Sequence, residues 1–286
     1  MIVPTHGRAD GLRVCLRHLA ALAYPLDRFE VIVVDDGSPE PVEEDIAPIG
    51  GELAVTVARQ ERSGPARARN VGADLAQGRY LAFTDDDCRP TPGWLAGFAA
   101  QFVETPAAAL GGATVNALPE NICSTASQLL CDYLYAYHNA DPEHARFFTS
   151  SNLALPADVF HDVGGFDTSF TLPAAEDRDL CDRLLRRNLR LVYVPAAVAY
   201  HAHPLTLAAF LGQHFRYGRG AFRFRSLGRA MGLDRDRLEP PIFYAELVGF
   251  PFGRAPAGRA TALAGLLALS QVANVAGFSR ELLAER

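Results

Sequence analysis

The feature that most constrains this chain is a run of three carboxylates directly after an apolar strand. Residues 80–83 have the composition of a buried strand, and Asp85, Asp86 and Asp87 follow almost at once. Like charges this close repel each other, and no arginine lies inside the run to neutralise them before Arg89. A divalent ion with oxygen ligands, itself holding a phosphate, would resolve this conflict. The run therefore predicts a site for a metal ion and a phosphorylated ligand.

Strands and helices alternate along the first half of the chain. Continuous apolar runs predict strands, and apolar residues repeating every three or four positions predict helices. The predicted strands are 2–3, 29–34, 54–58 and 80–83, and the predicted helices begin at Asp10 or Gly11 and at Ser63 to Pro65. This order predicts an α/β fold with a parallel sheet, where ligands gather at the carboxyl ends of the strands.

Polar residues follow three of these strands. Thr5 and His6 follow the first strand, Asp35 and Asp36 the second, and the carboxylate run 85–87 the last. Each loop alone is compatible with an ordinary turn, because Asp, Gly and Ser favour turns. Three such loops on one edge of a sheet instead favour a cofactor site there.

The second half of the chain continues the pattern with less regularity. Predicted strands are 110–115, 191–194 and 196–200, and residues 147–155 are either a strand or a loop entering the core. Predicted helices are 92–102, 124–136, 159–163 and 176–185. The helix 124–136 is rich in Leu and Tyr, which suits either the core or the lining of an acceptor cleft.

Asp177 lies at the start of a predicted helix whose apolar stripe includes Leu180, Cys181 and Leu184. It precedes Leu180 and Cys181 by three and four residues, so we expect it on the same side as the core. The helix dipole stabilises a carboxylate at this end. A plain helix cap is the alternative to a functional role for Asp177.

Two further clusters could serve a site for anions and metals. His201 and His203 follow a strand at a spacing of two, which would aim both rings at one face. Arg216, Arg219, Arg223 and Arg225 gather within ten residues, and they form either a solvated basic face or a site that binds anions.

Composition excludes several classes of protein. The 286 residues carry a formal net charge of −6, which argues against a general nucleic-acid partner. All 27 basic residues are arginine, so mechanisms that need a lysine, such as a Schiff base or a P-loop, are excluded. The absence of Gly-x-Gly-x-x-Gly after the first strand disfavours a dinucleotide oxidoreductase.

Cysteine usage and the two ends of the sequence bear on localisation. The five cysteines are scattered and never spaced Cys-x-x-Cys, which indicates neither a disulfide framework nor a zinc site and favours a reducing compartment. The start, Met-Ile-Val-Pro-Thr, does not resemble a secretory signal. The segment 259–280 is apolar but contains Gln271 and Asn274, so we favour a packed or interfacial helix over a spanning one.

The motifs together resemble family 2 glycosyltransferases, over roughly residues 1–220. The segments that occur in the family's order are 3–8 (VPTHGR), 31–38 (VIVVDDGS), 64–72 (GPARARNVG), 83–87 (FTDDD), 164–167 (GGFD) and 176–177 (ED). The resemblance implies a GT-A fold, with a Rossmann-like, mostly parallel sheet flanked by helices. It also implies inverting transfer from a nucleotide-sugar.

The same resemblance implies which residues hold the donor nucleotide. These would be Pro4, Thr5, His6, Arg8, Asp36, Arg69, Asp85, Asp86 and Arg216. Asp36 would accept an imino N–H of the base, which favours a uracil or thymine donor. The family's usual Tyr is His6 here, and this leaves the base preference open.

The resemblance also implies a metal site for Mn²⁺ or Mg²⁺. Asp85 and Asp87 correspond to the ends of the family's Asp-x-Asp motif, with Asp87 the more direct ligand. His201 resembles a histidine that completes the metal shell, with His203 as the competing candidate. Asp86, between the two ends, is expected to tolerate substitution.

The mechanism implied is a single displacement. Arg216 and the metal would neutralise the departing nucleoside diphosphate, and Asp177 would take the proton from an acceptor hydroxyl. Residues 213–217 resemble the Gln-x-x-Arg-Trp motif of processive synthases, although the bundle of spanning helices is missing. Alternatives are a sugar-1-phosphate nucleotidyltransferase, disfavoured by the lack of lysine, and a catalytically silent nucleotide-sugar-binding protein.

We therefore expect a catalytic domain over 1–220 and a helical C-terminal extension over 221–286. The partners would be a nucleotide-sugar donor and a glycan, lipid-linked or small-molecule acceptor, with no nucleic acid. The product would belong to cell-surface glycan or glycoconjugate synthesis. The expected location is the cytoplasm, with possible peripheral membrane contact through the C-terminal helix.

Overall fold

The computed structural model describes residues 1–42, 46, 53–233 and 239–285 of the chain. The described chain forms two compact units. The first unit comprises residues 1–115, 138–171 and 176–202, and the second comprises 116–137, 172–175 and 203–286. The predicted boundary at residue 220 falls inside a continuous helix, and part of the predicted extension (234–238 and 286) lies outside the described residues.

The first unit is built on one eight-stranded sheet with the order β3-β2-β1-β4-β7-β6-β8-β5. The strands are β1 (Ile2–Thr5), β2 (Val31–Asp36), β3 (Val55–Gln60), β4 (Tyr80–Thr84), β5 (Cys88–Pro90), β6 (Ala109–Asn116), β7 (Asn152–Pro156) and β8 (Leu191–His201). Strands β1 to β4 are parallel, with Thr5 opposite Asp35. Parallel pairing brings the carboxyl ends of β1, β2 and β4 to one edge of the sheet.

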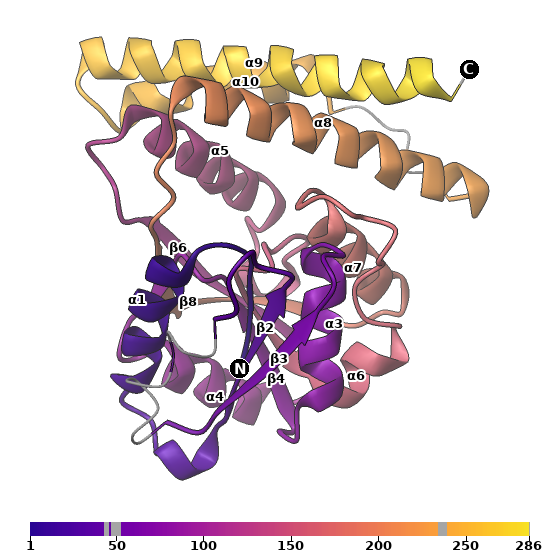
Figure 1. The fold of residues 1–286 in the computed structure, drawn as a ribbon. Coiled ribbons are helices and arrows are strands. Elements are labelled where there is room, and N and C mark those ends of the chain that lie inside the picture. Colours follow the sequence, from indigo (N-terminus) through magenta and orange to yellow (C-terminus); the bar gives the residue numbers. More distant parts are fainter. Residues whose placement is uncertain (43–45, 47–52, 234–238, 286) are drawn as a thin grey trace. The chain divides into compact units, whose positions relative to one another are not determined.

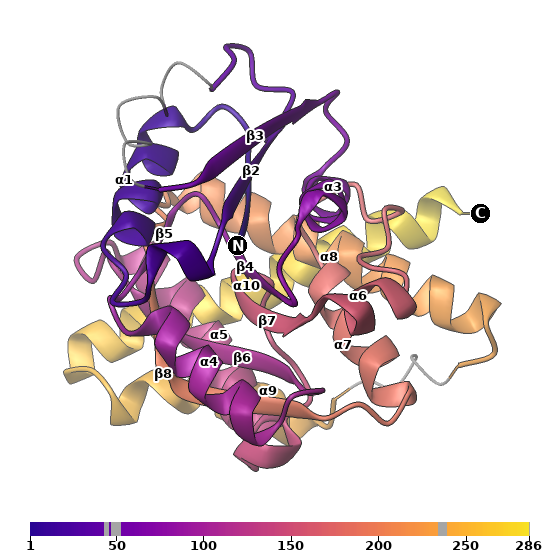
Figure 2. The same ribbon diagram turned by 90° about the horizontal axis from the view of Figure 1, so that it is seen from below.

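Helices cover both faces of this sheet, as Figures 1 and 2 show. They are α1 (Ala9–Ala20), α3 (Pro65–Leu75), α4 (Trp94–Glu104), α6 (Ala157–Asp162) and α7 (Glu176–Arg186), with short 3-10 turns at Leu26–Arg28 and Pro142–His144. Helix α1 buries the stripe Leu12, Cys15, Leu16 and Leu19 that its sequence spacing predicts. The predicted α/β sheet flanked by helices is confirmed.

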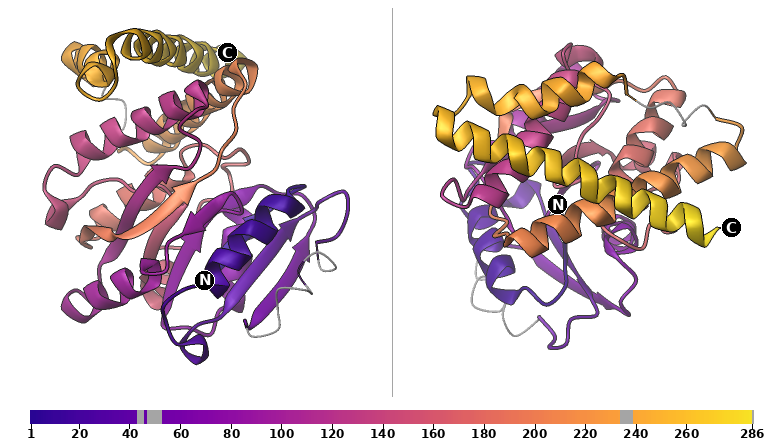
Figure 3. Two further views of the ribbon diagram at one scale, coloured as in Figure 1. Left: turned by 90° about the vertical axis from the view of Figure 1, so that its left-hand side faces the viewer. Right: turned by 90° about the horizontal axis from the view of Figure 1, so that it is seen from above.

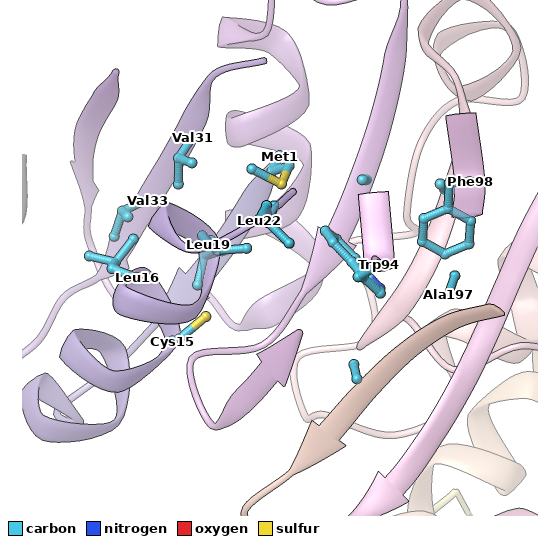
Figure 4. Packing of buried hydrophobic residues seen from close by; sticks show 14 of the residues in the cluster. Met1, Cys15, Leu16, Leu19, Leu22, Val31, Val33, Trp94, Phe98 and Ala197 are labelled. Carbon is cyan, nitrogen blue, oxygen red and sulfur yellow. The ribbon is translucent and has the colours of Figure 1, made fainter. Parts of the chain in front are cut away.

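The main core of this unit lies between the sheet and helices α1 and α4. Figure 4 shows Leu16, Leu19, Val31 and Val33 on one side of this core and Trp94 and Phe98 on the other. Trp94 is fully buried, and its indole N–H donates to the Asn152 side-chain oxygen over 2.8 Å. This bond satisfies a polar group that burial would otherwise make costly.

Two features of the sheet differ from the sequence prediction. The sheet is mixed, since three of its strand pairs are antiparallel: β4–β7, β6–β7 and β5–β8. The sequence of a strand does not record which neighbour it pairs with or in which direction. The predicted strands 191–194 and 196–200 are one continuous strand, β8. Pro195, between the two predicted strands, lies at an exposed position, where a missing N–H is tolerated.

The second unit is helical. Its helices are α5 (Ile122–His138), α8 (Leu207–Ala230), α9 (Pro241–Gly249) and α10 (Ala257–Ala284), with a 3-10 turn at Phe250–Gly253. Helices α8 and α10 pack against each other and cross in the right view of Figure 3, and they touch through glycines. A Cβ at Gly218 would collide with the Asn274 carbonyl oxygen, and one at Gly277 with that of Phe215.

Candidate active site

The carboxylate run 85–87 follows β4 at the edge where β1 and β2 also end, so the fold brings the three predicted polar loops together. Two arginines neutralise the run. Arg8 pairs with Asp86 Oδ1 at 2.7 Å and with Asp87 Oδ2 at 2.6 Å, and Arg69 donates to Asp85 Oδ1 over 2.7 Å. Arg8 and Arg69 are far from the run in sequence, so the prediction from neighbouring residues, which named a divalent ion, did not include them.

Asp86 is the most enclosed carboxylate of the run, with 0% exposure. The Thr5 hydroxyl donates to its Oδ2 over 2.7 Å, and Arg8 pairs with its Oδ1. Burial, which Arg8 opposes, raises the pKa of Asp86 to about 7. We therefore correct the prediction that Asp86 tolerates substitution, because this buried side chain ties β1 to the end of β4.

Arg69 joins two parts of the site from α3. Besides Asp85 it contacts Glu176 Oε1 over 3.1 Å, and its guanidinium lies 5.5 Å from the centre of the Phe166 ring. Burial opposes its charge, but Asp85 and Glu176 raise the pKa of Arg69 above its usual value. Arg69 therefore stays charged and links the carboxylate run to the start of α7.

Glu176 was not given a role by the sequence analysis, although it stands beside Asp177. It is buried, and burial together with the nearby Asp177 raises its pKa to about 7. The signal that could have found it is the buried position of Arg69 on α3, because a buried arginine requires an acidic partner.

Asp177 occupies the second position of α7 and is partly exposed, whereas Glu176 and Asp179 are buried. Asp177 lies three and four residues before Leu180 and Cys181, on the side of their apolar stripe, as expected. Asp179 is buried on another side of the helix and pairs with Arg183. The Arg178 amide donates to Asp177 Oδ1 over 2.7 Å. Burial nevertheless raises the pKa of Asp177, and its side chain stays accessible beside the Arg69–Glu176 pair.

A candidate metal centre lies where the turn between β4 and β5 meets the end of β8. Ligand atoms of Asp87, Cys88 and His201 lie within 4.8 Å of one another. His201 Nε2 is 3.2 Å from Asp87 Oδ1, and antiparallel pairing sets His201 opposite Cys88. Burial opposes protonation of His201, but its hydrogen bond to Asp87 raises the pKa.

The donor atoms of this cluster fit a divalent metal. A carboxylate and an imidazole are ligands that Mn²⁺ accepts readily. The thiol of Cys88 is buried, and burial raises its pKa well above the usual range, which disfavours it as a thiolate ligand. Asp87 and His201 are therefore the residues of this group that suit the ion.

Asp36, at the end of β2, organises the neighbouring loop. Its Oδ1 accepts from the Gln60 side chain and from the Ser63 amide, each over 2.7 Å, and its Oδ2 accepts from the Gly64 amide over 2.8 Å. A carboxylate offers about four acceptor positions, so one more donor can be accommodated. His6 Nδ1 lies 2.8 Å from the Asp36 carbonyl oxygen, which brings the two predicted nucleotide loops together.

Asp35, the other carboxylate at the end of β2, has a structural role. Its Oδ1 accepts from the Ser38 amide over 2.8 Å, and Arg59 donates to its Oδ2 over 2.9 Å. Pro4 lies within β1 and is buried.

Two of the predicted site residues belong to the second unit. His203 Nε2 lies 2.8 Å from the Gln213 side-chain oxygen, and the Gln213 amide donates to Ser127 over 2.9 Å. Arg216 is half-buried on α8, one turn after Gln213. In the first unit, by contrast, it is His201 that stands against Asp87.

Comparison with known families decides what kind of protein this architecture represents. Residues 1–164 match the model of glycosyl transferase family 2, which is more than half of the chain. The chain belongs to glycosyl transferase family 2. The resemblance inferred from the motifs is thereby confirmed.

Curated relatives of this family 2 chain come from bacteria and archaea. It is 32% identical over 227 residues to the pre-mycofactocin glycosyltransferase of Mycobacterium tuberculosis, covering 77% of this chain and 46% of that protein. It is 26% identical to the glycosyltransferase AglE of Haloferax volcanii, covering 80% and 74% respectively. The chain thus spans about half the length of the first of these relatives.

Solved structures confirm the fold of this family 2 chain. The mannosyltransferase PcManGT of Pyrobaculum calidifontis superposes with a TM-score of 0.67 at 19% identity, covering 96% of this chain and 86% of that one. TarS of Staphylococcus aureus gives a TM-score of 0.56 at 20% identity, with 97% and 88% covered. At these identities the likeness establishes the GT-A fold alone.

Proposed function

We propose that this family 2 chain is an inverting, metal-dependent glycosyltransferase. It moves a sugar from a nucleoside diphosphate donor to an acceptor hydroxyl, in the synthesis of a cell-surface glycan or glycoconjugate. The observation that carries the proposal is the meeting of Asp85, Asp87 and His201 with the Glu176–Asp177 pair in one unit, joined by Arg69.

The donor nucleotide is assigned to the loops after β1 and β2. The remaining acceptor position of Asp36 suits an imino N–H, which uracil and thymine both present, so a uridine or thymidine diphosphate sugar is favoured. PcManGT was solved in complex with GDP-Man, and TarS in complex with UDP-GlcNAc. A guanosine diphosphate sugar therefore belongs among the donors to be tested.

The metal is assigned to Asp87, with Asp85 and His201 completing its surroundings and His203 as the competing histidine. The PcManGT structure holds Mn²⁺, which supports Mn²⁺ or Mg²⁺ here. A divalent cation supplies positive charge for the diphosphate leaving group. Arg216 is assigned to the same diphosphate, and Arg69 fixes the Asp85 carboxylate in place.

Asp177 is assigned as the catalytic base. It takes the proton of the acceptor hydroxyl as that oxygen bonds to the anomeric carbon, while the bond from this carbon to the diphosphate oxygen breaks. One carboxylate suffices because an inverting transfer is a single displacement. The raised pKa that burial gives Asp177 makes it a stronger base than an exposed aspartate.

The acceptor is a molecule with a free hydroxyl group. A glycan, a lipid-linked saccharide or a small molecule would each present a hydroxyl to Asp177. We place the enzyme in the cytoplasm, with peripheral contact to the cytoplasmic face of a membrane through α10, which among the described helices is long and apolar enough to cross a membrane.

The decisive experiment combines a donor screen with one substitution. Uridine, thymidine and guanosine diphosphate sugars are tested with Mn²⁺ by thermal shift, and the best donor is then assayed for nucleoside diphosphate release with candidate acceptors. Asp177→Asn should keep donor binding and lose transfer by at least a hundredfold. Full transfer in Asp177→Asn would refute the assigned base.

Asp182→Asn is the matched control, since Asp182 lies on the same helix and pairs with the exposed Arg186. It should leave the rate within about twofold. Release of pyrophosphate in place of nucleoside diphosphate would identify a nucleotidyltransferase instead. Tight donor binding without transfer or hydrolysis would identify a silent binding protein.

A further inference from the structure

Helix α10 exposes a continuous apolar face. Its exposed residues recur every three or four positions and so lie on one side of the helix. They are Ala262, Gly265, Ala268, Leu269, Val272, Val275 and Ala276, called here the apolar face of α10. Between Ala260 and Ser279, all of which the structure describes, no residue is charged and Thr261 alone is both polar and exposed.

The opposite side of α10 is fully used inside the second unit. Leu263 packs among residues of α5 and α8, including Leu129 and Phe210, and Leu267 packs against Phe243 and Leu247 of α9. Gly277 admits the backbone of α8 at a distance that no side chain would allow. This packing holds α10 flat along its neighbours.

A membrane-spanning position is therefore disfavoured. Spanning would carry α8 into lipid with α10, because the two helices are joined through Gly218 and Gly277. Helix α8 bears several arginines, and Arg219 pairs with Glu281 of α10. Charged side chains at the centre of a bilayer cost several kcal/mol each. A helix with one packed side and one apolar exposed side suits the interface of a bilayer instead.

The elements next to α10 also expose apolar side chains. Ile242 and Tyr244 of α9 and Phe252 of the following turn are exposed, and α9 lies beside α10 in Figure 3. Tyrosine and phenylalanine at such a position are typical of the boundary between headgroups and acyl chains.

The second unit and the first unit carry net charges of opposite sign. In sequence, the second unit contains eleven arginines and eight acidic residues, a net charge of +3. Since the whole chain carries −6, the first unit carries −9. The exposed Arg254 and Arg259 precede the apolar face of α10, and the exposed Arg280 follows it. Positive charge at both ends of an apolar face complements anionic lipid headgroups.

We propose that the apolar face of α10, together with the exposed side chains of α9 and the turn after it, lies in the interface of an anionic lipid bilayer, with α10 parallel to the bilayer surface. This deepens the membrane contact within the proposed function, and it stands or falls independently of the transfer chemistry. Pairing of two copies through the same face is disfavoured, because it would bring two units of charge +3 together.

The test is flotation with lipid vesicles of the full chain and of the double variant Val272→Glu/Val275→Glu. Val272 and Val275 are 67% and 64% exposed, so the changes do not disturb packing. Wild type should float with vesicles of phosphatidylcholine and phosphatidylglycerol and bind pure phosphatidylcholine at least tenfold less. The double variant should lose at least tenfold in binding to the anionic vesicles.

Val103→Glu is the matched control, since this valine of α4 in the first unit is 78% exposed. It should float like wild type, and thermal unfolding should confirm that every variant is folded. Failure of wild type to float, or undiminished binding by the double variant, would overturn the proposal. The proposal would also be overturned if light scattering showed that wild type is a dimer and the double variant is a monomer. Resistance of bound protein to alkaline carbonate extraction would overturn the parallel orientation.

Discussion

At the scale of single residues, the site is governed by how buried carboxylates are neutralised. Arg8 and Arg69 hold the run Asp85–Asp87, and each bridges two acidic groups. A buried carboxylate without such a partner would be protonated or would bind a cation. The sequence shows the carboxylates, whereas Arg8 lies 79 residues from Asp87 and Arg69 lies 16 residues from Asp85.

Arg8 should compete with the metal for Asp87. Its guanidinium is bonded to Asp87 Oδ2 and its side chain is 49% exposed, so it can leave without unfolding the site. Arg8→Met removes this internal cation and leaves the negative charge of Asp86 and Asp87 uncompensated. We expect Mn²⁺ affinity without donor to rise about tenfold, or about 1.4 kcal/mol, measured from the free Mn²⁺ signal in electron paramagnetic resonance.

Arg13→Met is the control for this experiment, because Arg13 of α1 pairs with the exposed Asp10. It should leave Mn²⁺ affinity unchanged. Equal or weaker Mn²⁺ binding by Arg8→Met would show that Arg8 supports the metal site and does not compete for it.

His214 should make the stability of the protein depend on pH. The ring is buried between Phe210 and Tyr217, and burial lowers its pKa to about 4. Within the described part of the chain, its Nε2 has no hydrogen-bond partner. Because the unfolded chain takes up this proton near pH 6.5 and the folded chain only near 4, stability falls as pH drops through this window.

Because of His214, we expect the free energy of unfolding to fall by about 2 kcal/mol between pH 7 and pH 5. It is measured as the difference in the free energy of unfolding in urea between wild type and His214→Phe, which keeps a ring but cannot titrate. Parallel pH curves for the two proteins would contradict the prediction.

At the scale of elements, glycine sets how closely α8 and α10 approach. Gly277 faces the Phe215 carbonyl, and Gly218 faces that of Asn274. Both sit inside long helices, where glycine costs about 1 kcal/mol relative to alanine. The structure shows why they are useful there, since any side chain would force the two helices apart.

Gly277→Ala should therefore destabilise the protein by about 2 kcal/mol or more, because the overlap involves backbone that cannot move alone. Gly265→Ala on the same helix is the matched control. Its Cβ would meet nothing within 4 Å, so it should stabilise by about 0.5–1 kcal/mol through helix propensity alone. Urea unfolding measures both, and equal effects of the two changes would refute the packing explanation.

At the scale of the whole molecule, binding of the donor nucleotide-sugar should stabilise the folded protein, and this stabilisation should depend on the metal. A ligand that binds only the folded state stabilises it by about 2.7 kcal/mol at a concentration of about 100 times Kd. We expect a donor nucleotide-sugar to raise the melting temperature with Mn²⁺ present and much less after chelation with EDTA. Thermal shift with and without chelator measures this difference.

Asp87→Ala should abolish the Mn²⁺-dependent part of the rise in melting temperature that the donor causes, because Asp87 is the carboxylate beside His201. Asp74→Ala is the control, since the Asp74 side chain is largely exposed and lies 3.8 Å from His161. Retention of the full Mn²⁺-dependent shift in Asp87→Ala would remove Asp87 from the metal site.

The alternation of strands and helices, the family, and the edge of the sheet where the polar loops end could all be predicted from the sequence. These are local properties, because apolar spacing, turn residues and motif order are written in neighbouring residues. The core stripe of α1, and the strands that end at Asp36 and directly before Asp85, were predictable for this reason.

Which charges meet, and which strands run in opposite directions, became known from the folded chain alone. Arg8 with Asp86 and Asp87, Arg69 with Glu176, and the continuity of β8 through Pro195 all depend on how distant segments pack together. Asp86 is the enclosed carboxylate of the run, and Glu176, beside Asp177, is buried against Arg69. Pairing across the fold is set by the packing of whole elements, which no local pattern records.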